Sequence, residues 1–70
     1  MKRLSFASNF LLTKTVEFLL MSGVSSNDLL VWDNQTILVP ENKYSVVKKL
    51  TDLFLNSIKN QNAEVTYNAN

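Results

Sequence analysis

The last third of the chain has the clearest pattern of hydrophobic and polar positions. Between residues 43 and 59 the apolar residues fall on one side of a helical wheel and the charged and amide residues on the other. The apolar set is Val46, Val47, Leu50, Leu53, Phe54 and Ile58. Pro40 precedes this segment, and Glu41 stands where its charge interacts favourably with a helix dipole. The pattern predicts an amphipathic surface helix over residues 42–59.

Residues 6–22 are also compatible with a helix, but one without a clean polar face. The segment ends at Gly23, the only glycine, which suits the left-handed position after a helix, so that Val24 would fold back on the last turn. One broad apolar face consists of Leu11, Leu12, Val16, Phe18, Leu19 and Leu20. The opposite face carries Phe6, Phe10 and Met21 beside Lys14 and Glu17. A helix apolar nearly all round is covered on two sides, so we expect the Phe6/Phe10/Met21 face to contact a second chain.

Two apolar runs, Leu29–Trp32 and Ile37–Val39, flank the polar residues 33–35. Asp-Asn at a tight turn between such runs favours a β-hairpin over residues 29–39. Strands that are continuously apolar are usually covered on both faces, and a lone two-stranded hairpin is marginal in water. We therefore expect the hairpin to join the same interface through Trp32, Ile37 and Val39.

An alternative interpretation makes the segment after Gly23 helical. Ser25 followed by Asp28 resembles a capping box in which Asp replaces Glu. Residues 15–34 then resemble the helix-turn-helix of small phage excisionases and related regulators, which implies a mostly helical fold and DNA binding. The resemblance is carried by Gly23, Val24, Leu29 and Trp32. The segment departs from that motif because its second half contains no Arg or Lys to meet phosphates or guanine edges.

The predicted fold class is α+β, a small α-β-β-α domain over residues 1–60 that pairs with a copy of itself as a C2 dimer. Residues 61–70 lose the helical period and are rich in Asn, so we expect a flexible tail, although Val65–Tyr67 could add a short strand. The chain is 46% hydrophobic and 19% charged, which is typical of a folded domain. A domain of this size buries only roughly 60–65% of its unfolded surface. Cys and His are both absent, so oligomerisation is the remaining route to further burial.

The residue inventory argues against catalysis. Without Cys or His the chain has no thiolate nucleophile, no catalytic triad and no usual transition-metal site. A single glycine excludes a Gly-rich phosphate loop, and no two of the six acidic residues are held together by their spacing. We expect no enzyme activity, no cofactor, no metal and no small-molecule substrate.

Charge and hydropathy limit the partners. Seven basic and six acidic residues give a net charge of +1, far from the basic balance of a domain that neutralises many phosphates. Lys43, Lys48 and Lys49 are the candidate nucleic-acid contacts, although lysines beside Asp52 are typical of a solvated helix face. Asn9 and Lys14 interrupt the apolar run that a secretion signal needs, and no stretch approaches the roughly 20 apolar residues that span a bilayer. We expect a cytoplasmic protein without membrane contact.

The sequence therefore predicts a small binding module, a homodimeric regulator or inhibitor that contacts another protein. High Asn and Lys usage suggests an A/T-rich phage, mobile-element or bacterial genome. Two other hypotheses stay open: a small DNA-binding transcriptional regulator of the helix-turn-helix type, and a structural subunit of a larger assembly. The candidate interface residues are Phe6, Phe10, Met21, Trp32, Ile37 and Val39.

Overall fold

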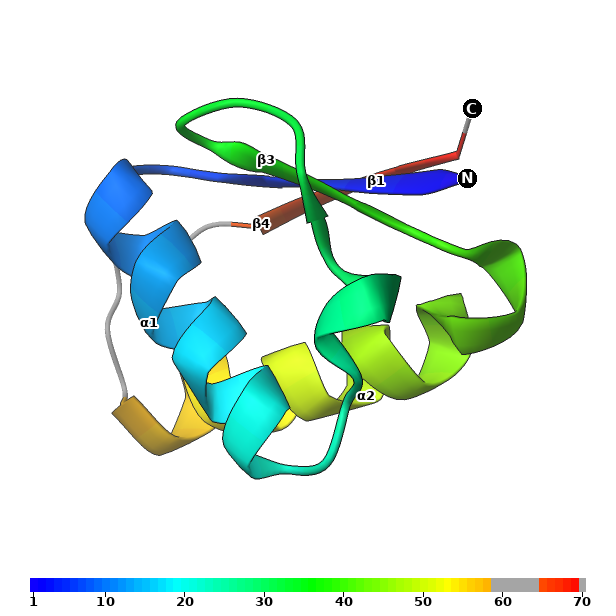
Figure 1. The fold of residues 1–70 in the computed structure, drawn as a ribbon. Coiled ribbons are helices and arrows are strands. Elements are labelled where there is room, and N and C mark those ends of the chain that lie inside the picture. Colours follow the sequence, from blue (N-terminus) through cyan, green and yellow to red (C-terminus); the bar gives the residue numbers. More distant parts are fainter. Residues whose placement is uncertain (59–64, 70) are drawn as a thin grey trace.

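The chain folds into one sheet with two helices on one of its faces. The computed structural model describes residues 1–58 and the backbone of residues 65–69. In chain order the elements are β1 (Lys2–Phe6), α1 (Asn9–Met21), the 3₁₀ turn η1 (Ser26–Asp28), β2 (Leu30–Val31), β3 (Thr36–Val39), α2 (Glu41–Ile58) and β4 (Val65–Ala69). Helices α1 and α2 contact each other and lie on the same side of the strands (Figure 1). The other face of the sheet carries no helix from the described residues.

The strands are arranged in the order β2-β3-β1-β4. β3 pairs antiparallel with both β1 and β2, so β1 and β2 run parallel to each other, and α1 connects them across β3. β3 and β4 are related in the same way across β1, with α2 as their connection. Two interleaved split βαβ units of this kind make the ferredoxin-like βαββαβ topology. Since this topology serves many unrelated functions, it does not assign one here.

The expected α+β class is confirmed, with helix, hairpin and second helix in the expected order. The predicted end of the first helix is also observed. Gly23 has a positive φ of 100°, and the N–H of Val24 donates to the carbonyl of Leu19 at 3.0 Å. The N–H of Gly23 itself donates to Leu20 at 3.1 Å, which completes a Schellman cap.

Strand β1 is the element that the sequence interpretation missed, because Phe6 was assigned to the first helix. Leu4 and Phe6 are buried while Arg3 is exposed, which is the period-two pattern of a strand covered on one face. The helix begins only after Ser8. The backbone of Ser8 is extended, and its Oγ accepts a hydrogen bond from the N–H of Leu11 at 3.1 Å, as an N-cap does.

The segment expected to be a tail contributes a strand. Residues 61–64 and 70 lie outside the described residues, but Val65–Ala69 form β4. In the sheet register Tyr67 lies opposite Leu4 of β1. The short strand considered for Val65–Tyr67 is therefore the arrangement observed.

The helix-turn-helix alternative is wrong for the fold. A single 3₁₀ turn, Ser26–Asp28, follows α1, and the Oγ of Ser25 accepts the N–H of Asn27 at 3.2 Å. Leu30–Val31 then form a strand instead of continuing a helix. The segment consequently offers no second helix that could lie in a DNA groove.

The core fills the single layer between the sheet and the helices. Leu4 and Ile37 lie opposite each other in the register, and both are fully buried. The buried apolar set is Leu4, Phe6, Leu11, Leu12, Leu19, Leu29, Ile37, Val39 and Val47. Three expected interface residues, Phe6, Ile37 and Val39, therefore belong to the protein's own core. The correction has a simple cause, since β1 extends the hairpin into a wider sheet whose inner face the protein's own helices cover.

The buried stripe of α2 is rotated from the predicted one. Val47 and Thr51 are buried, whereas Val46 and Leu53, which the wheel placed on the apolar face, are more than half exposed. A threonine at the centre of the stripe was not counted as a core residue. The helical wheel therefore centres the buried stripe of α2 on the apolar residues beside Thr51 and not on Thr51 itself.

Replacing a buried threonine by valine should stabilise the protein. The hydroxyls of Thr15 and Thr51 are buried with no hydrogen-bond partner, and a buried hydroxyl left unpaired costs about 1–3 kcal/mol. Thr51→Val keeps the shape of the side chain and removes that cost. We expect the free energy of unfolding in urea to rise by about 1 kcal/mol. The exposed position Thr13 supplies the control, since Thr13→Val should give no such gain; a loss of stability in Thr51→Val would contradict the assignment.

Candidate protein-binding surfaces

Apart from Met1 at the start of the chain, the described residues expose large apolar side chains in two places. The first set lies on the helices and is called here the helix surface: Phe10, Leu20, Met21, Val46, Leu53 and Ile58. The second set follows β2 and is called the β2 surface: Leu30, Val31 and Trp32. Soluble monomers seldom expose large contiguous apolar patches, and those that exist often mark interaction sites. These two surfaces are therefore the candidate functional sites.

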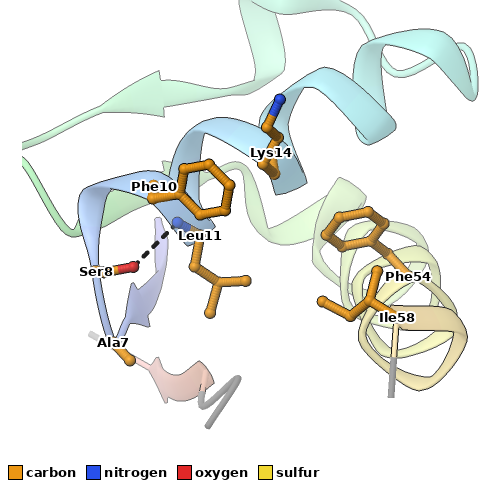
Figure 2. A pocket seen from close by; sticks show the side chains of 7 residues that line it. All are labelled: Ala7, Ser8, Phe10, Leu11, Lys14, Phe54 and Ile58. Atoms are coloured by element: carbon orange, nitrogen blue, oxygen red, sulfur yellow. Dashed lines mark hydrogen bonds between the residues drawn. The ribbon is translucent and has the colours of Figure 1, made fainter. Parts of the chain in front are cut away.

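A groove of about 780 Å³ opens between the start of α1 and the end of α2. Figure 2 shows Phe10 and Leu11 of α1 on one side of this groove and Phe54 and Ile58 of α2 on the other. The ring of Phe10 is 71% exposed, so an apolar partner that entered the groove would cover it. The residues that line the groove are Ala7, Ser8, Phe10, Leu11, Lys14, Phe54 and Ile58.

Among the described residues that line the groove, Lys14 is the one with a charged side chain. Its ammonium lies 3.6 Å from the Oε1 of Glu17 and 5.6 Å from the centre of the Phe10 ring. Lys14 and Glu17 are both about half exposed, and such surface ion pairs contribute little to stability. Lys14 is therefore available to exchange Glu17 for an acidic group brought by a partner.

Aromatic packing connects the two helices that form the groove. The rings of Phe18 on α1 and Phe54 on α2 stack with their centroids 5.0 Å apart. Ser8, which caps α1, lies on the groove wall beside the first turn of that helix. The stacked rings connect α1 to α2 beside the opening, and the Ser8 cap fixes where α1 begins.

The β2 surface lies at the edge of the sheet. β2 pairs with β3 on one side only, with Leu30 opposite Leu38 and Val31 opposite Ile37. Because cross-strand partners share a face and Ile37 faces the helices, Leu30 lies on the uncovered face of the sheet. Trp32 lies two residues further along, on that same face, and is 65% exposed. The edge strand therefore presents two large apolar side chains to solvent.

The turn between β2 and β3 is anchored to the junction of β1 and α1. The side-chain amide of Asn9 donates to the carbonyl of Asn34 at 2.9 Å, and that of Gln35 donates to the carbonyl of Ala7 at 2.9 Å. Within the turn, the Oδ1 of Asp33 accepts the N–H of Gln35 at 2.8 Å. This hydrogen bond is the main reason that the pKa of the Asp33 carboxyl lies below its ordinary value of 3.8.

Three of the six predicted interface residues remain exposed. Phe10 and Met21 lie on α1, and Met21 is 86% exposed. By the register of the hairpin, Trp32 lies on the face of the sheet that α1 and α2 do not cover, so the structure does not bring it together with the other two. Leu30 and Val31 were not among the predicted interface residues, although both lie in the uncharged apolar run Leu29–Trp32, which indicates an apolar strand.

The predicted nucleic-acid contacts lie along α2. The ammonium of Lys48 is 3.7 Å from the Oδ2 of Asp52, while Lys43 and Lys49 are exposed. Arg3 lies on the face of the sheet away from the helices. These basic side chains are therefore divided between two sides of the molecule and do not form one basic surface.

Other kinds of site find little support in the part of the chain that the structure describes. No group of three acidic residues there could hold a metal ion. None of the described helices has the length and hydropathy needed to cross a membrane. No protein-family model, curated protein or solved structure matches this chain.

Acidification should loosen the anchored turn. The pKa of the Asp33 carboxyl is lowered on folding. The stabilisation that the charged carboxylate provides is therefore present above the ordinary pKa of 3.8 and is lost as the pH falls through the lower pKa of the folded state. The emission of Trp32, the only tryptophan, reports on this turn because it directly precedes Asp33. We expect an emission change below about pH 4 that is absent in Asp33→Asn. An equal change in both proteins would show that another carboxyl group causes it.

Proposed function

We propose that the protein is a small non-enzymatic binding module that acts in the cytoplasm as a homodimer and regulates or inhibits another protein by direct contact. The observation that supports this most strongly is the presence of two separate uncovered apolar surfaces on one 70-residue chain. Each surface has an exposed aromatic side chain, Phe10 on the helix surface and Trp32 on the β2 surface. Aromatic residues are enriched among those that dominate binding energy at protein interfaces. One surface serves self-association and the other serves the target.

The groove at the Phe10 and Ile58 end of the helix surface suits the target. A groove between two helices with apolar walls accepts the apolar face of a third helix, one of the recurring modes of peptide recognition. Phe10 and Ile58 supply apolar contacts from opposite walls, and Lys14 supplies a single positive charge at the edge. We therefore propose a target helix with apolar residues three or four positions apart and an acidic residue beside them.

Burial of these surfaces would also add stability that the small core of this domain lacks. A 70-residue domain buries a smaller fraction of its surface than a larger one does. Each apolar Å² removed from water contributes about 25 cal/mol, and a partner that binds only the folded state stabilises that state by mass action. Self-association therefore supports both the stability and the function of the module.

The homodimer has a direct test in the mass of the purified protein. Light scattering across a dilution series should give twice the 8.0 kDa of one chain at high concentration and fall toward 8.0 kDa on dilution. The reason is that the β2 surface is uncovered in the monomer. A well-folded monomer at every concentration would contradict the homodimer, while leaving target binding to the next experiment.

Target binding is tested by selecting peptides that bind the wild-type protein from a displayed random library and then measuring their affinities by titration. We expect the selected peptides to have apolar residues at helical spacing and an acidic residue. Phe10→Asp should weaken their binding roughly thirtyfold or more, which is the effect of losing a strong interface residue. Phe10 is largely exposed, so the variant should remain folded.

The matched control for that titration is Met21→Asp, which places the same charge on α1 but does not line the groove. It should bind the selected peptides like the wild type. Peptides that bind Phe10→Asp as tightly as the wild type would exclude the groove as the target site.

A further inference from the structure

We infer that the homodimer forms by antiparallel pairing of β2 with β2 of a second copy, which joins the two four-stranded sheets into one continuous sheet. The inference rests on the proposed function, since it names the contact through which the module dimerises. Three features of the described residues carry it: the outward backbone groups of β2, the absence of edge protection, and the self-complementary register of the strand.

The outer edge of β2 has unpaired backbone groups at one well-defined residue. The N–H of Trp32 donates to the carbonyl of Thr36 at 2.8 Å, so these two residues form a hydrogen-bonded pair. Hydrogen-bonded and non-hydrogen-bonded pairs alternate along an antiparallel ladder, so Val31 and Ile37 form a non-hydrogen-bonded pair. The N–H and C=O of Val31 therefore point away from β3, toward the position of a further strand.

The described residues give this edge none of the usual protection against strand addition. Natural edge strands are blunted by charges, prolines, bulges or covering segments. Residues 29–32 contain neither a charge nor a proline, and the side chains of Leu30, Val31 and Trp32 are half exposed or more. Acidic residues occur only at the flanks, at Asp28 and Asp33. The open segment is short, which favours a specific pair of strands over extended aggregation.

The segment is complementary to itself. A two-fold axis through Val31 places Val31 opposite its own copy and Leu30 opposite Trp32 of the second copy. Leu30 and Trp32 lie on the same, uncovered face, so the four side chains of the two copies meet there as cross-strand neighbours.

Charge also favours a second copy at this edge. Residues 29–32, which would face the second copy, carry no charge, so no two like charges are opposed within the paired segment. The net charge of +1 per chain adds little repulsion between two copies. A second copy of this chain is therefore the occupant that fits this edge.

The pairing leaves the target groove open and duplicates it. A two-fold axis perpendicular to a continuous sheet keeps both pairs of helices on the same side of that sheet. The dimer would then carry two Phe10 grooves, one from each copy. A target with two helical segments, or a dimeric target, would gain avidity because its second contact is intramolecular.

The sharpest test is Val31→Pro. Proline removes the outward N–H of residue 31, which the pairing with β3 does not use, so the hairpin itself is retained at this edge position. The variant removes a hydrogen bond from each copy, and we expect the dimer dissociation constant to rise about tenfold or more, measured by light scattering on dilution. The Trp32 emission should shift to longer wavelength at the same concentrations, because dissociation returns the ring to water.

A second variant and a direct backbone measurement keep the test independent of the fold of Val31→Pro. Leu30→Lys places a charge in the cross-strand cluster and should give a folded monomer. In the wild type, hydrogen exchange at the Val31 amide should be slow at dimer concentrations and fast on dilution. Phe10→Asp is the control and should dimerise like the wild type.

The outcomes separate the two proposals. A dimer that resists Val31→Pro and Leu30→Lys, whether or not Phe10→Asp splits it, would overturn the β2 pairing while the homodimer stands. A wild type that is monomeric throughout would overturn both the homodimer and the pairing. Loss of the dimer in Leu30→Lys, with its retention in Phe10→Asp and protection of the Val31 amide, supports the pairing.

Discussion

The pairing of β1 with both β3 and β4 is the constraint on which the fold depends. β1 lies between these two strands, so it holds a strand from the middle of the chain and a strand from its C-terminal part in one sheet. Leu4 and Ile37 face each other across the β1–β3 ladder without solvent exposure, and they form the surface on which the helices pack. Without β1 the hairpin of β2 and β3 would be a two-stranded ribbon, which is marginal in water.

The local parts of this fold were predictable, and the long-range pairing was not. The helix end at Gly23 and the turn at Asp33 depend on residues within a few positions of each other, and both are where the sequence predicts them. β1 pairs with residues more than thirty positions away, and five residues with two buried apolar side chains also fit the start of a helix. A helix that includes Phe6 leaves the hairpin without a neighbouring strand, so the sequence pattern predicts a second chain as its cover.

The missing strand β1 also explains why three of the six expected interface residues, Phe6, Ile37 and Val39, lie in the protein's own core. Ile37 and Val39 were correctly identified as side chains that need burial, but the burial comes from α1 and α2 of the same chain. Phe10 and Met21 lie on the side of α1 away from the sheet, so their exposure follows from the helical period alone. The exposure of Val46 and Leu53 on α2 could not be anticipated, because it depends on the burial of the polar residue Thr51 at the centre of the stripe.

The anchored turn gives the two uncovered surfaces a fixed relation to each other. Ala7 lines the groove, and its carbonyl accepts a hydrogen bond from Gln35 of the turn that follows Trp32. Asn9, the first residue of α1, holds the same turn through Asn34. The groove wall and the strand edge are therefore joined by short hydrogen bonds instead of a flexible linker. Avidity depends on whether two sites can be spanned at once, so a dimer made through this edge would present its two grooves at a defined separation, and a target would be selected by its geometry as well as by its sequence.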